Sequence, residues 1–246
     1  MKTSERKQRE VQQREELLLA LARTMLIEQG YAGLSMDRLA EASEYSKGTV
    51  YHHFATKEDL VTALAVQSNA QRIALFDRAR VYNGRPRERM VALGFADELF
   101  ARLHPHYFHA EMIVRMADLG DRATAERLGA FGCQDDLICG WVCDIVRDAE
   151  RAGDIVLKPP TTAGSVAFGV FTLAIGTHEA MTKLPHTLNA FEIGDPFAVM
   201  SQNIQHFLDG LGWRPLVSEW DYAETLRKVA REIFADECNR VGLATS

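Results

Sequence analysis

The stretch from Leu34 to Asp59, LSMDRLAEASEYSKGTVYHHFATKED, limits the possible folds of this chain more than any other. It predicts two short helices joined by a tight turn. The second helix carries small, polar and aromatic residues where a buried helix would carry aliphatic ones. This pattern is typical of a helix-turn-helix, whose second helix enters a groove of duplex DNA.

Local signals around this stretch set the helix boundaries. A first helix is expected from about Val11 to Gln29, ended by Gly30 as a C-terminal cap. Its apolar face follows three- and four-residue spacings and consists of Leu18, Leu21, Ala22, Met25 and Leu26. Three polar side chains stand where N-caps belong before the next three helices, namely Ser35, Ser46 and Thr56.

The rest of the chain shows helical periodicity nearly everywhere, and signals for β-strands are scarce. Breaks at glycine and proline separate the expected helices, which cover about 57–82, 87–103, 106–118, 121–152, 161–183, 196–209 and 218–240. The sequence therefore predicts an all-α fold. We expect a mobile arm over 1–10, a helix-turn-helix domain over 11–64 and a larger helical domain over 65–246.

The charge of the chain limits how it can bind DNA. The formal net charge is -6 over 246 residues, and residues 1–60 carry nine basic and ten acidic side chains. Attraction to phosphate should be weak, so binding must depend on a few well-placed contacts. Four cysteines and an N-terminus without an apolar core favour a cytoplasmic protein. The uncharged run 159–177 fits a buried helix at a protein interface better than a membrane span.

The helix-turn-helix residues resemble the tetracycline-repressor (TetR) family of transcriptional regulators. The resemblance spans roughly Leu17 to Leu64 and is specific, because several spaced features agree at once. The matching residues are Gly30-Tyr31, Ser35, Leu39-Ala40-Glu41-Ala42, Ser46-Lys47-Gly48-Thr49-Val50-Tyr51-His52-His53-Phe54 and Thr56-Lys57-Glu58-Asp59-Leu60.

Duplex recognition needs base readers and phosphate anchors. Lys47 and Thr49 stand near the start of the second helix of the motif, where base edges are met, and Gly48 lets the helix approach the groove. Hydroxyl, imidazole and ammonium groups nearby suit phosphate. The resemblance supports these positions, and the full expected DNA-contact set is Ser35, Ser46, Lys47, Gly48, Thr49, Tyr51, His52 and Lys57. Val50 and Phe54, four residues apart, are expected to face inward instead.

Two residues of the turn depart from the family pattern. The family usually has Ala-Gly-Val-Ser, whereas this chain has Ser43-Glu44-Tyr45-Ser46. Glu44 replaces a glycine that favours left-handed backbone, at a cost of about 1 kcal/mol. Tyr45 has to fill a site that a smaller aliphatic residue usually occupies.

The resemblance implies that residues from about 65 onward form a helical domain for an effector and for dimerisation. The segments 161–183 and 196–209 are the expected dimer helices, because the first combines small residues with apolar ones. Residues of the second that could complete a four-helix interface are Val199, Ile204, Phe207, Leu208 and Leu211. The alternative is that both helices are buried within one monomer.

Aromatic and methionine side chains cluster in the larger domain and favour a hydrophobic small-molecule effector. Each of them could equally be a plain core residue. The expected ligand-binding residues are Phe95, Phe100, Phe108, Met112, Met116, Trp141 and His178. No metal site and no cofactor are expected, because the chain has neither a CxxC pair nor an HExxH motif.

Several functions remain open from the sequence. The first is a ligand-responsive repressor that binds a pseudo-palindromic operator as a homodimer and is released by its effector. An activator of the same family and a dimeric adaptor with a weakened DNA head are alternatives. A helical enzyme using His104, His109 or Cys139 is another, although no nucleophile and base assemble there.

Overall fold

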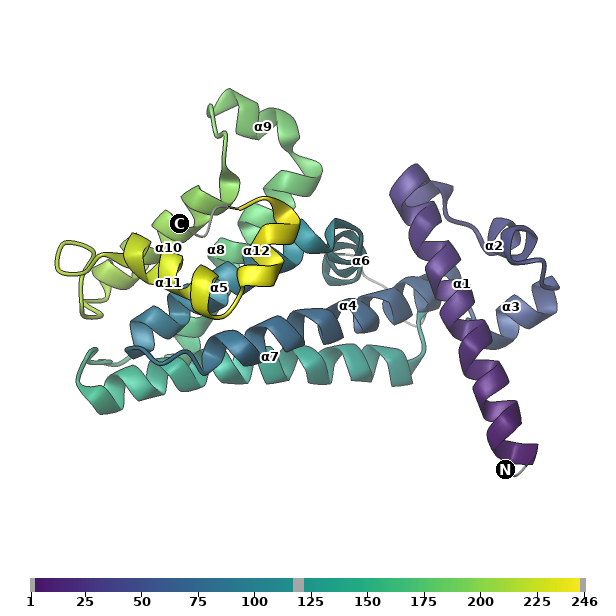
Figure 1. Cartoon of the computed structure of the whole chain (residues 1–246), viewed down its shortest axis with the longest axis horizontal. Helices are drawn as coiled ribbons and strands as arrows, with labels where there is room; N and C mark the ends of the chain where they lie inside the picture. Colours follow the sequence, from purple (N-terminus) through teal and green to yellow (C-terminus); the bar gives the residue numbers. More distant parts are fainter. Residues whose placement is uncertain (1–2, 117–121, 244–246) are drawn as a thin grey trace. The chain divides into compact units, whose positions relative to one another are not determined.

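The structure is a computed structural model that describes residues 3–116 and 122–243, and within these ranges it consists of helices and loops without a strand (Figure 1). The predicted all-α fold is confirmed. The helices divide between two compact units. Residues 1–70 and 104–134 form the first unit, and residues 71–103 and 135–246 form the second.

The first unit begins with α1 (Thr3–Gly33), followed by α2 (Met36–Ser43), α3 (Lys47–His53) and α4 (Lys57–Arg80). α6 (Pro105–Met116) and the first residues of α7 (Ala125–Ala152) also belong to it. α1 starts eight residues earlier than expected, so the predicted boundary at Val11 is wrong. Gly30, with φ 67° and ψ -176°, interrupts helical geometry at the position where a cap was expected. Mobility of residues 1–10 stays a prediction.

The three expected N-caps of the helix-turn-helix are confirmed. The Ser35 hydroxyl accepts from the Arg38 amide at 3.2 Å, and the Ser46 hydroxyl accepts from the Thr49 amide at 3.1 Å. The Thr56 hydroxyl accepts from the Asp59 amide at 2.9 Å. Each bond satisfies an amide that has no partner inside its own helix, so the sequence itself fixes where α2, α3 and α4 begin.

One buried apolar cluster holds the first unit together. Val50 and Phe54 are both 0 % exposed, which confirms that they face inward. The helix-turn-helix contributes most of the cluster, together with Ala110 and Val114 of α6 and Phe131 of α7. Its fully buried members from the motif and its neighbours include Leu18, Ala22, Leu39, Leu60 and Val61.

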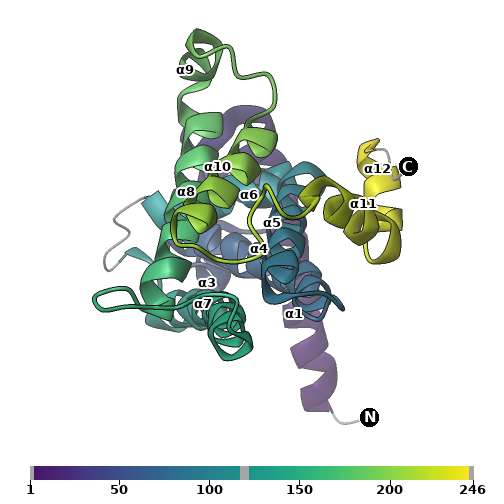
Figure 2. The same cartoon turned by 90° about the vertical axis from the view of Figure 1, so that its left-hand side faces the viewer.

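The second unit is built around α5 (Pro86–Leu103), whose apolar side chains are almost all buried. α8 (Ala163–Lys183) packs on α10 (Pro196–Gly210), and the two run side by side in Figure 2. α11 (Tyr222–Glu232) and α12 (Ala235–Val241) pack on α5. Short α9 (Pro185–Ala190), which the sequence did not predict, follows α8.

Two expectations about the second unit are wrong. Residues 218–240 form two helices rather than one, because the chain turns at Phe234, whose side chain is 0 % exposed in the core. Ile204 and Leu208 of α10, expected at a dimer interface, are already buried within this unit. α10 points them toward neighbouring helices of its own chain, which leaves other residues to form any interface.

The turn between α2 and α3 contains the left-handed residue that the sequence indicated. Glu44 has φ 58° and ψ 17° and serves as the C-cap of α2, with its amide donating to the Glu41 carbonyl at 3.2 Å. The chain therefore keeps the turn geometry that glycine favours and bears the steric cost of a Cβ there.

Glu44→Gly is expected to raise the free energy of unfolding by about 1 kcal/mol, because glycine adopts this backbone without the Cβ clash. Thermal unfolding followed by circular dichroism measures the change. The control is Glu41→Gly, which removes an exposed carboxylate from inside α2 and should lower stability by about 1 kcal/mol. If both variants lower the melting temperature, Glu44 is not strained.

Candidate DNA-binding site

The short helix α3 presents one exposed polar face. Lys47, Gly48, Tyr51 and His52 are exposed, and the Tyr51 side chain is the largest of them, at 49 % exposure. The opposite face is closed, because Val50 and His53 lie in the interior. A seven-residue helix that buries one face and shows small and polar groups on the other fits the shape of a major-groove reader.

The hydroxyl groups at the start of α3 are already engaged with each other. Ser46 Oγ and Thr49 Oγ1 lie 2.9 Å apart in a hydrogen bond, and Ser46 also caps the helix. Thr49 is partly buried. In this arrangement the methyl group of Thr49 is the part left for an apolar contact, whereas Ser46 acts through the geometry of the helix start.

Lys47, the expected base reader, is paired within the protein. Its ammonium lies 2.8 Å from the Asp37 carboxylate of α2. The hydrogen bond and the charge of Asp37 raise the pKa of Lys47 above its usual value. Both side chains are exposed, so the pair can exchange for contacts with DNA.

Lys57, the expected phosphate anchor, is held by Tyr31. The ammonium sits 3.8 Å from the centre of the Tyr31 ring and donates a hydrogen bond to the Tyr31 carbonyl. The Tyr31 hydroxyl donates to Glu58 at 3.1 Å, and burial followed by this bond raises the pKa of Tyr31. Burial lowers the pKa of Lys57. The tyrosine therefore fixes the lysine at the start of α4.

Tyr45 is the second residue of the turn that departs from the family pattern. Its ring is partly buried and packs against the core of the first unit, and the guanidinium of Arg14 lies 5.5 Å from the ring centre. α1 thus provides the surface that accommodates an aromatic side chain in place of a smaller one.

Some of the expected effector residues lie in the first unit. Phe108 and Met112 of α6 are 5 % and 2 % exposed. The side chain of Met116 lies outside the described residues. Burial of this kind is equally what a core requires, so a role for Phe108 and Met112 in ligand binding stays a prediction.

The remaining expected effector residues lie in the second unit. Phe95 and Phe100 of α5 are 6 % and 0 % exposed, and Trp141 of α7 is partly exposed. His178 of α8 is 2 % exposed, with Nε2 at 2.9 Å from the Asp97 carboxylate. Asp97 of α5 therefore orients this ring, a pairing that no pattern in the sequence indicates.

The described part of the chain contains neither a cluster of metal-binding side chains nor a helix that could span a membrane. There, no three histidine, cysteine or acidic side chains gather closely enough to hold a metal ion. The side chain of His109 lies outside the described residues, and Cys139 is exposed. No helix within 3–116 and 122–243 has the length and apolar character to cross a membrane.

Comparison with known proteins identifies the motif. Residues 18–64 match the family model described as "Bacterial regulatory proteins, tetR family", and this range contains α2, α3 and the exposed face described above. This match places the helix-turn-helix of this chain, within residues 18–64, in the tetR family. The resemblance seen in the sequence is confirmed, and the chain is a transcriptional regulator rather than an enzyme.

Individual proteins share sequence or fold with this chain. The chain is 26 % identical over 161 residues to the HTH-type transcriptional regulator UidR of Escherichia coli (strain K12), covering 60 % of this chain and 72 % of UidR. It is 43 % identical over 54 residues to the HTH-type transcriptional repressor AcnR of Corynebacterium glutamicum, covering 22 % of this chain and 29 % of AcnR. The crystal structure of AibR in complex with isovaleryl coenzyme A and operator DNA shares the fold, with a TM-score of 0.55, 16 % identity and coverage of 81 % of this chain and 98 % of AibR.

Asp37→Asn is expected to increase affinity for DNA by up to about fivefold, because it releases Lys47 and removes a carboxylate that competes with phosphate and base edges. Fluorescence anisotropy with a labelled duplex at near-physiological salt measures the change. The same substitution in a Lys47→Ala background is the control. An equal gain in both backgrounds would show that Asp37 acts by general repulsion and not through Lys47.

Proposed function

We propose that this tetR-family regulator is a repressor that binds a pseudo-palindromic operator as a homodimer and is released by a hydrophobic small-molecule effector. The observation that carries the DNA-binding part is the exposed polar face of α3 over a closed core. Two such helices related by a twofold axis would enter successive major grooves.

The proposed base readers are Lys47 and Thr49, with Gly48 between them allowing close approach. A side chain at Gly48 would meet only Ser46 Oγ within the protein, at 3.8 Å, so the glycine is not required by internal packing. That leaves close approach to a partner as the reason for a glycine on this face. The proposed phosphate anchors are Ser35, Tyr51, His52 and Lys57.

A dimer through α8 and α10 is supported by an apolar surface on α8. Phe168 is 65 % exposed and Phe171 is 40 % exposed, and their rings stack with centres 6.5 Å apart. An exposed aromatic pair on an otherwise uncharged helix face is typical of a surface that another protein covers. Gly169 brings α10 close on the adjacent face, where an added Cβ would lie 2.4 Å from Phe207.

A hydrophobic effector is supported by the buried aromatic side chains Phe95 and Phe100 of the second unit. The fold neighbour AibR was solved with an acyl coenzyme A and with operator DNA, which shows that this fold can accommodate both kinds of partner. An effector acts on operator affinity only if it binds the DNA-free and DNA-bound arrangements differently, with a coupling of about 1–3 kcal/mol in typical cases.

Selection of bound sequences from a random duplex pool should recover an inverted repeat whose half-sites lie about one helical turn apart, or a multiple of it. Thr49→Ala should reduce the preference for the selected duplex over other sequences. Lys57→Ala should weaken binding to all sequences and make the affinity for DNA depend less steeply on salt concentration. Anisotropy titrations at several salt concentrations distinguish the two effects. If the selection enriches no sequence, the adaptor function is favoured, in which the helix-turn-helix domain binds DNA only weakly.

Phe168→Glu should raise the dimer dissociation constant by about 30-fold or more, because it places a charge inside the proposed interface. Sedimentation over a dilution series measures the dissociation constant. Val81→Glu, at a site that is 64 % exposed outside α8 and α10, is the control and should have no effect. If Phe168→Glu and Val81→Glu had the same dimer dissociation constant, the α8 surface would be excluded as the interface.

A further inference from the structure

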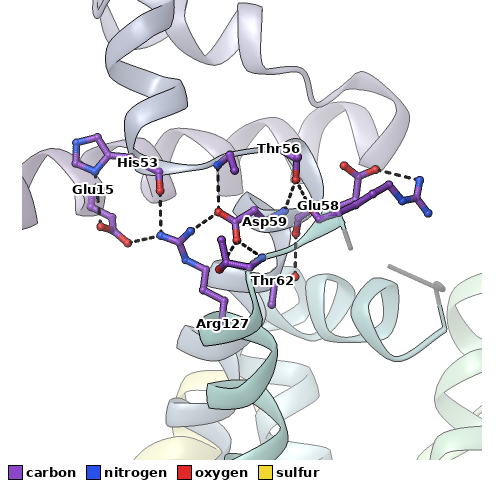
Figure 3. Close-up of polar contacts among 10 residues, drawn as sticks. Glu15, His53, Thr56, Glu58, Asp59, Thr62 and Arg127 are labelled. Carbon is purple, nitrogen blue, oxygen red and sulfur yellow. Dashed lines mark hydrogen bonds and ion pairs between the residues drawn. The ribbon is translucent and has the colours of Figure 1, made fainter. Parts of the chain in front are cut away.

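Arg127, in the first turn of α7, contacts α1, α3 and α4 of the helix-turn-helix domain at once (Figure 3). Its guanidinium donates to Glu15 of α1 at 3.1 Å and to the His53 carbonyl at the end of α3 at 3.0 Å. It also forms a hydrogen-bonded ion pair with the Asp59 carboxylate of α4. All these residues belong to the first unit.

The Asp59 carboxylate is fully buried and uses both oxygens. One oxygen accepts from the Thr124 amide at 2.9 Å and from the Thr124 hydroxyl at 2.8 Å. The other accepts from the Ala55 amide at 3.2 Å and from Arg127. A charge removed from water needs such partners, and these come from the loop after α3 and from the residues that begin α7.

The carbonyl of His53 belongs to the last residue of the recognition helix α3. Carbonyls at a helix C-terminus lack a partner within the helix and carry its negative dipole end, so a guanidinium there is favourable. Arg127 also lies over the ring of Phe54, 4.8 Å from its centre, and Phe54 is the C-cap of α3. One side chain therefore fixes both the terminal carbonyl and the capping residue.

We infer that Arg127 is a positioning residue for DNA recognition, although it lies in α7, far outside the helix-turn-helix sequence. The exposed residues Tyr51 and His52 directly precede the carbonyl that Arg127 holds. Because α3 is only seven residues long, a shift at its C-terminal end changes the direction of the whole exposed face. The inference rests on the proposed DNA-binding function.

A purely structural role for Arg127 makes a different prediction. It would lower the melting temperature but leave the discrimination between operator and unrelated DNA unchanged at temperatures where every variant is folded. A positioning role lowers that discrimination even in folded protein, because correct base contacts need a correctly oriented helix.

The experiment compares Arg127→Met with Arg122→Met in the full-length protein. Arg122 is exposed, lies just before α7 and pairs with Glu58 at 3.5 Å, so its loss removes the same charge from the same segment. Anisotropy titrations at one salt concentration measure the affinity for the selected operator and for an unrelated duplex. The first affinity divided by the second is the specificity ratio. We expect Arg127→Met to reduce this ratio by about tenfold or more and Arg122→Met to leave it unchanged.

Arg127→Lys tests the same point with the charge retained. A lysine cannot reach the three acceptors in the planar geometry of a guanidinium, so the specificity ratio should still fall. If Arg127→Met does not fold, this variant decides. An unchanged ratio in a folded Arg127 variant would overturn the inference.

Hydrogen exchange in the absence of DNA keeps the two proposals separable. Amides of residues 50–56 should exchange faster in Arg127→Met than in the wild-type protein, whereas those of α2 should change little. If the wild-type protein selects no operator, the proposed function fails. The exchange rates of the amides of residues 50–56 still test whether Arg127 holds the end of α3. If exchange at 50–56 is unchanged as well, the positioning role is overturned independently.

Discussion

A carboxylate without access to water has to be surrounded by donors, and Asp59 is the residue on which the geometry of the first unit depends. Its partners come from the loop after α3 and from the start of α7. Removing Arg127 would leave this buried carboxylate without its counter-ion, and removing a neutral donor would leave it with one hydrogen bond fewer. The end of α3, the beginning of α4 and the beginning of α7 are therefore arranged together around a single buried carboxylate.

The local features of the helix-turn-helix could be read from the sequence because they depend on neighbours. A hydroxyl at an N-cap bonds an amide two or three residues away, so Ser35, Ser46 and Thr56 mark the helix starts whatever the rest of the chain does. The inward positions of Val50 and Phe54 follow from helical spacing. Even the strained backbone at Glu44 could be anticipated, because the turn demands it.

The sequence was less informative where a side chain is long or its partner is distant. Nothing in the spacing pairs Lys47 with Asp37 or places Lys57 over Tyr31, since flexible chains have many acceptors in reach. Arg127 lies 68 positions from Asp59, so only the fold brings them together. The break at Phe234 was missed because its amphipathic surroundings continue a helical pattern that tertiary packing interrupts.

The bond between the hydroxyls of Ser46 and Thr49 has a consequence for the chemistry that α3 can distinguish. With its hydroxyl engaged with Ser46, Thr49, as a proposed base reader, would present its methyl group to a base. Such a group senses the substituent at carbon 5 of a pyrimidine rather than its hydrogen-bonding edge. Thymine and 5-methylcytosine carry the same substituent there. Through such a contact the protein would bind a 5-methylcytosine as it binds a thymine. Methylation of a cytosine at this position of an operator would therefore change the affinity of the protein for that operator.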